Sequence, residues 1–141
     1  MGIKYESPGG AGPGAANAIA FAAGNFSATG AMTWTVDLAD QVTYAFMLEG
    51  KKLTLWFRLL NTTVGGVVAG NNLLMKLPLG LLAALETVQD VSAAPGGSPS
   101  EGILALTQVG LNNVTLLRYA ANWIAGANNT DVNGVVVVPV Q

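Results

Sequence analysis

The sequence contains no cysteine and no histidine. These two side chains carry much of the nucleophilic catalysis, the acid–base catalysis near neutral pH and the zinc binding found in proteins. Their absence predicts that the chain is not an enzyme, has no catalytic residues, and binds no metal ion or other cofactor. Without cysteine, disulfide bonds cannot stabilise the fold either.

Charged residues are also scarce. Six Lys and Arg residues and eight Asp and Glu residues give a net charge of −2 over 141 residues, and 51% of the chain is hydrophobic. Because nucleic-acid binding needs a basic stripe and the six cations are scattered, nucleic acid is not an expected partner. A monomer of this size leaves roughly a third of its unfolded-chain surface in water. So few charges solvate such a surface poorly, and we expect copies of the chain to cover one another.

Long hydrophobic runs are absent as well. The longest uninterrupted apolar run covers residues 77–85 and contains Pro78 and Gly80. A membrane-spanning helix needs about 20 apolar residues, so no transmembrane segment is expected.

Glycine, in contrast, is abundant, and its distribution divides the chain. Residues 1–18 are rich in Gly and Pro without any apolar period, which predicts a flexible lead-in. Residues 19–141 are expected to form one β domain. The eighteen glycines of the whole chain, together with repeated short apolar segments, favour an all-β sandwich or jelly roll over a helical bundle.

Alternating apolar and polar residues predict the strands. Residues 31–38 alternate as a half-buried strand does, and residues 42–48 and 52–60 are expected to pair as a hairpin around a turn at 49–51. The other expected elements are strands at 72–77, 103–109, 113–120 and 134–140, loops at 61–66, 94–99 and 125–133, and a segment at 79–91 that fits either a short helix or a strand.

Two of these strands are apolar on both faces. Trp56 and Leu60 lie on the nominally polar face of the strand at 52–60, and residues 135–138 form an uninterrupted run of valine. Such runs are typical of strands that are covered on both sides, so we expect the valine strand to lie centrally in its sheet. A sandwich buries one face of each sheet, and a symmetric oligomer interface is the simplest cover for the second.

The order of short motifs over residues 30–80 resembles that of a known family. The motifs are Val42-Thr43-Tyr44, Leu48-Glu49-Gly50-Lys51, Leu53-Thr54-Leu55-Trp56-Phe57, Asn61-Thr62-Thr63-Val64-Gly65-Gly66 and Leu74-Met75-Lys76-Leu77-Pro78. They resemble the C-terminal tip domains of tailed-bacteriophage fibres, tail needles and virion spikes. The resemblance implies a homotrimeric jelly roll similar to the tumour-necrosis-factor and complement globular-head folds. It also implies a place in the virion, at a tail or spike tip, and attachment to a host surface or capping of a fibre.

Candidate receptor-binding residues gather near the expected loop at 125–133. Trp123 is the best candidate for an exposed aromatic ring, which can stack on a sugar or can instead anchor the core or an interface. Asn128, Asn129 and Asp131 form an oxygen-rich cluster that suits receptor contacts or Ca²⁺, although Asn and Asp are also ordinary turn residues.

Candidate interface residues lie inside apolar strands. Arg58 and Arg118 each interrupt such a strand, where a charge is costly unless it is paired. Each arginine either reaches water, or forms a salt bridge across a subunit interface, or binds a carboxylate near a trimer axis. Trp56 is the expected aromatic anchor beside Arg58. The carboxylates Asp37 and Asp40 are interpreted as turn residues rather than as a hydrolytic pair.

These observations together predict a non-enzymatic viral structural protein. Its trimer is expected to present the loops at 61–72, 94–101 and 125–133 to a host cell-surface glycan or protein, or to cap the fibre. Two alternatives from other classes remain, a carbohydrate-binding module and a secreted cytokine-like ligand on a similar fold.

Overall fold

The computed structural model describes residues 16–141, and every strand pair in it is antiparallel. The strands are β1 (Asn17–Ala18), β2 (Phe26–Ala28), β3 (Met32–Thr35), β4 (Gln41–Glu49), β5 (Lys52–Gly66), β6 (Leu73–Lys76), β7 (Thr87–Ala94), β8 (Glu101–Thr107), β9 (Asn113–Leu117) and β10 (Gly126–Pro139). Short 3₁₀ turns lie at Ala23–Asn25, Leu38–Asp40, Pro78–Gly80 and Pro95–Gly97. The expected all-β class is therefore confirmed. Most of the predicted lead-in lies outside the described residues, and its last two residues form β1.

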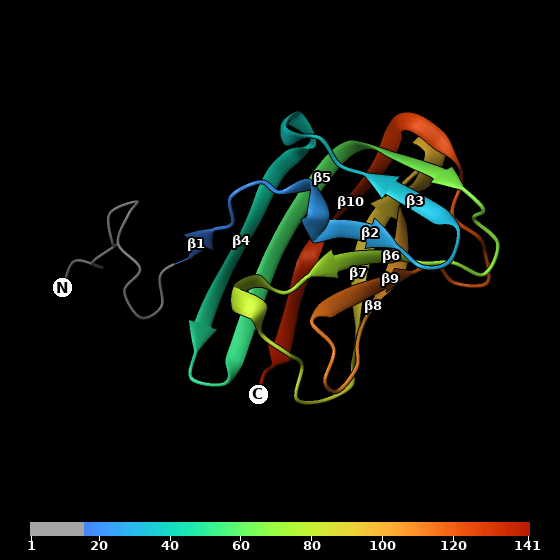
Figure 1. The fold of residues 1–141 in the computed structure, drawn as a ribbon. Helices are drawn as coiled ribbons and strands as arrows, with labels where there is room; N and C mark the ends of the chain where they lie inside the picture. Colours follow the sequence, from blue (N-terminus) through green and yellow to red (C-terminus); the bar gives the residue numbers. More distant parts are fainter. Residues whose placement is uncertain (1–15) are drawn as a thin grey trace.

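The strands form one sheet that curls back on itself as a sandwich does. The order is β1-β4-β5-β10-β7-β8-β9-β6-β2, and β3 pairs with the far end of β5. Figure 1 shows β4, β5 and β10 side by side, with β2, β6 and β9 crossing them in a second layer. The two ends of the sheet meet at Phe26 of β2, whose ring centroid lies 5.3 Å from that of Tyr44 on β4.

The core lies between the two layers and follows the period-two pattern of the strands. On β5 the side chains of Leu53, Leu55, Phe57 and Leu59 are buried, and Val136 of β10 lies opposite Leu55. The second layer contributes fully buried residues from its own strands: Leu73, Met75, Ile103, Val114 and Leu116. Burying each such side chain stabilises the fold by about 1.5–3 kcal/mol, so the core accounts for the closure of the sandwich.

Several buried polar groups in this core form hydrogen bonds that connect strands. Trp34 Nε1 donates to Thr62 Oγ1 at 2.9 Å, and Thr62 Oγ1 donates to the carbonyl of Thr130 at 2.7 Å. The Tyr44 hydroxyl donates to the carbonyl of Lys76 in the opposite layer. Burial raises the pKa of the Tyr44 phenol, which therefore stays protonated as a donor. These bonds tie β3, β5 and β10 together and β4 to β6.

The strand β10 lies centrally in the strand order, as expected, but its valine run pairs only with β5 and is not buried on both faces. Val136 and Val138 are buried, whereas Val135 is 47% exposed and Val137 is 40% exposed. In a strand successive side chains point to opposite faces, and only one face of β10 meets the core. The expectation of burial on both faces is therefore wrong for the single chain.

Two expected loops are strands instead. After Leu60 the strand β5 continues through a bulge at Asn61 and pairs with β3, so residues 61–66 are not a loop. Residues 126–133 form the first half of β10 rather than a polar loop. The undecided segment at 79–91 is a 3₁₀ turn, then an extended stretch with a bridge between Ala83 and Val140, then β7.

Among the described residues, no helix has the length and the apolar character to span a membrane.

Candidate functional site

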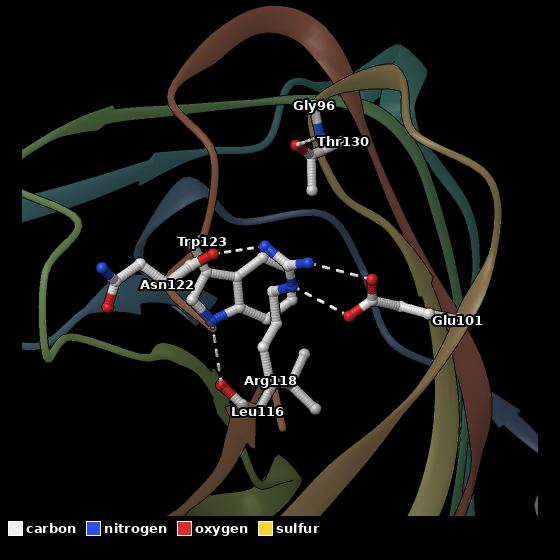
Figure 2. Close-up of polar contacts among 7 residues, drawn as sticks. All are labelled: Gly96, Glu101, Leu116, Arg118, Asn122, Trp123 and Thr130. Atoms are coloured by element: carbon white, nitrogen blue, oxygen red, sulfur yellow. Dashed lines mark hydrogen bonds and ion pairs between the residues drawn. The ribbon is translucent and has the colours of Figure 1, made fainter. Parts of the chain in front are cut away.

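Three loops meet at the end of the sandwich where β5 ends and β10 begins; they span residues 67–72, 95–100 and 118–125. The Gly70 N–H donates to Asn122 Oδ1 at 3.2 Å, which joins the first loop to the third. The Gly96 N–H donates to Thr130 Oγ1 at 3.0 Å, which joins the second loop to β10 (Figure 2). We call these three loops the loop end. Parts of two predicted presenting segments, 61–72 and 94–101, do lie here.

Arg118, at the base of the third loop, is paired within its own chain. Its Nε and Nη2 donate to Glu101 Oε2 and Oε1 at 2.8 and 2.9 Å, and its Nη1 donates to the carbonyl of Asn122 (Figure 2). The hydrogen bonds from Arg118 hold the pKa of Glu101 below its usual value. The charge is therefore satisfied inside the chain by Glu101, a partner that none of the three alternatives for Arg118 named.

Trp123 belongs to the third loop, but its side chain is only 2% exposed. Its Nε1 donates to the carbonyl of Leu116 at 3.3 Å, and Figure 2 shows the ring turned inward beside Arg118. The prediction that Trp123 is the exposed aromatic is therefore wrong. The hydrogen bond from Arg118 to the carbonyl of Asn122 holds the backbone just before Trp123. The spacing of residues in the sequence does not predict that contact.

The oxygen-rich residues near β10 are used in strand contacts. The Asn128 N–H donates to Thr63 Oγ1 at 2.9 Å, and Asp131 Oδ1 accepts from the Asn61 N–H at 2.7 Å. Asn129 Oδ1 is buried and has no hydrogen-bond partner among the described residues. The bonds of Asn128 and Asp131 hold β10 against the bulged half of β5. Residues 16–141 contain no group of three or more His, Cys, Asp or Glu side chains that could hold a metal ion.

The exposed groups of the loop end are different from those that the sequence singled out. Tyr119 is 66% exposed, Val67 is 57% exposed and Ile124 is 38% exposed. An exposed phenol ring can stack on a sugar ring and its hydroxyl can bond the sugar hydroxyls. The sequence placed Tyr119 inside the expected strand at 113–120, but β9 ends at Leu117, so the residue lies on the third loop instead.

Two other predicted residues lie away from the loop end, on the outer face of β5. Arg58 is exposed, lies opposite Asn133 of β10 and forms no ion pair with any described residue. Trp56 is half-buried and lies between Ala45 of β4 and Val135 of β10. The predicted site residues therefore divide between the loop end and this outer face.

A cleft of about 420 Å³ opens between the β1–β4 edge and the 3₁₀ turn that follows β6. Its lining includes the apolar side chains of Ile19, Phe46 and Leu77 and the polar side chains of Asn25 and Lys76. The cleft can admit a small apolar group with an anion near Lys76. No motif in the sequence marked it, because the curl of the sheet alone brings these elements together.

Comparison of the chain with protein-family models, with curated proteins and with solved structures found no match.

Proposed function

We propose that the chain is a non-enzymatic structural domain that assembles with copies of itself. The observation that carries the proposal is the apolar outer face of β5 and β10, where Trp56, Val135 and Val137 face away from the core. Contiguous apolar side chains on a soluble domain mark interaction surfaces. A homotrimeric jelly-roll head at the tip of a bacteriophage fibre, needle or spike is the assembly that this proposal favours.

The use of the carboxylates supports a structural role. The Asp37 N–H is bound by Asp40 Oδ2 at 2.9 Å, which closes a 3₁₀ turn. Glu101 is held by Arg118, and Asp131 accepts a backbone hydrogen bond. Glycoside hydrolysis needs two carboxyl groups facing each other across a bond, whereas these groups are committed to turns and strand contacts.

In the proposed assembly the loop end faces outward and contacts a host-surface glycan or protein. Tyr119 and Ile124 are exposed there on loops that are tied to the sandwich by the Gly96–Thr130 and Gly70–Asn122 hydrogen bonds. Three linked copies of such a surface bind a repetitive receptor more tightly than one copy, without any new contact.

Sedimentation equilibrium of the full chain tests the proposal. One chain has a mass of 14.4 kDa, and the proposal predicts a species of three times that mass at micromolar concentration. A single species at the mass of one chain over the whole concentration range contradicts it.

A carbohydrate-binding module is the second candidate, and the exposed ring of Tyr119 favours it. A glycan array distinguishes such a module from a purely mechanical fibre cap, because a module predicts a defined sugar signal that Tyr119→Ala abolishes. A fibre cap predicts no sugar signal. The variant Val109→Ala is the control, since Val109 is 60% exposed on the β8–β9 turn, outside the loop end.

A further inference from the structure

The outer face of the sheet is apolar across several neighbouring strands. Met47 of β4 lies opposite Thr54 of β5, which in turn lies opposite Val137 of β10. Two residues along these strands, on the same face, Trp56 lies opposite Val135. On the far side of β10, Val88 of β7 is 58% exposed. We call Met47, Trp56, Val135, Val137 and Val88 the outer apolar strip.

Two opposite charges lie beside the strip, on either side of β10. Asn133 of β10 lies opposite Arg58 on one side and opposite Ser92 of β7 on the other. Asp90 shares the outer face of β7 with Ser92, because Val91 between them is buried. Arg58 and Asp90 therefore lie on the two sides of β10. Both are exposed, and neither forms an ion pair with any residue from 16 to 141.

The strand edge beside the strip is closed to an added strand. Beyond Asn133 the strands β7 and β10 no longer pair, which leaves the backbone of Val137 open on that side. Gln89 occupies this position, since its Oε1 accepts from the Val137 N–H at 2.8 Å and its Nε2 donates to the Val137 carbonyl at 2.9 Å. A partner on this surface must therefore pack with side chains rather than by strand addition.

We propose that the outer apolar strip packs against a second copy of the chain, with Arg58 of one copy opposite Asp90 of the next. Because the cation and the anion lie on opposite sides of β10, the cation of each copy meets the anion of the next around a closed ring, which a lone cation or anion would not allow. In any closed symmetric assembly each interface repeats the same contact. This inference rests on the proposed function and names the surface that it uses.

A charge exchange in the full chain tests the pairing. Arg58→Asp and Asp90→Arg each place two like charges together at the interface. Each should raise the dissociation constant measured by sedimentation roughly tenfold or more, and the double variant should recover most of that loss. The controls are Lys51→Asp and Glu86→Arg, which change exposed charges outside the strip and should leave the dissociation constant unchanged.

A second variant keeps the test independent of the ion pair. Val137→Lys places a charge in the strip at a position that a single chain leaves 40% exposed, so the monomer should fold with an unchanged circular dichroism spectrum but fail to associate. Val109→Lys is the matched control. An assembly that persists unchanged in all the strip variants overturns this inference alone. A native chain that stays monomeric overturns both the inference and the proposed function.

Discussion

The side-chain amide of Gln89 takes the place of a strand partner for Val137. Its two hydrogen bonds, of 2.8 and 2.9 Å, satisfy the N–H and the carbonyl of Val137 where β7 leaves β10. An exposed strand edge invites pairing with other chains. Gln89 therefore joins the two halves of the sheet at their junction and protects an edge that the strand ladder leaves open.

Replacing Gln89 with Met keeps the length of the side chain and removes both hydrogen bonds. We expect the free energy of unfolding in urea to fall by about 1–2 kcal/mol, because two backbone groups lose their partner. The Val137 amide should also exchange its hydrogen with solvent faster. Gln108→Met is the control, since Gln108 is exposed on the β8–β9 turn, and it should change stability by less than about 0.5 kcal/mol. Equal effects of the two substitutions would contradict the role of Gln89.

The Glu101–Arg118 pair predicts a defined pH dependence. The pKa of Glu101 is lowered in the folded chain from its ordinary value of 4.5. The stabilisation is therefore fully present above that ordinary value and is lost as the pH falls through the folded-state pKa. Glu101→Gln should lower the urea midpoint at about pH 7 and have a smaller effect at about pH 3.

Glu86→Gln supplies the matched control for that experiment, because Glu86 is exposed and forms no ion pair with a described residue. A loss of stability in Glu101→Gln that is the same at both pH values would show that the pair does not act through its charge.

Asn61 holds the bulge of β5 with a left-handed backbone, at a φ of 60°. Asn61→Gly should leave thermal stability nearly unchanged, because glycine adopts this conformation freely. Asn61→Val should cost about 1–2 kcal/mol, since a β-branched side chain is strained there. Asn113→Val on β9, where φ is not positive, separates this strain from the loss of an amide. If valine is tolerated equally at both positions, the bulge imposes no such constraint.

The sequence predicted the parts of the fold that depend on local pattern. Alternation located β4 and most of β5, the Gly50 turn between them has the positive φ that glycine permits, and Pro78 ends β6. These features follow from the two-residue period and from the backbone limits of glycine and proline.

The parts that depend on tertiary contacts were not predictable in this way. Residues 61–66 and 126–133 have the Asn, Thr and Gly content of a loop, yet both form strands because of their pairing partners. Residues 61–66 pair with β3 and with β10, and residues 126–133 pair with β5. Trp123 is buried and donates to the carbonyl of Leu116, a contact that depends on how the third loop folds back over β9. The hydrophobic pattern of a single chain also does not show whether a side chain on an apolar strand faces water or another copy of the chain.

The most direct test of the central claim is the reactivity of a single thiol at Val137. The chain has no cysteine of its own, so Val137→Cys and Val109→Cys each carry one thiol at a partly exposed position. If copies cover the outer apolar strip, the thiol at position 137 should react slowly with a maleimide in concentrated protein and quickly after dilution, whereas the thiol at 109 should react quickly in both. Equally fast reaction at position 137 at every concentration, in a chain that remains folded, would contradict the account.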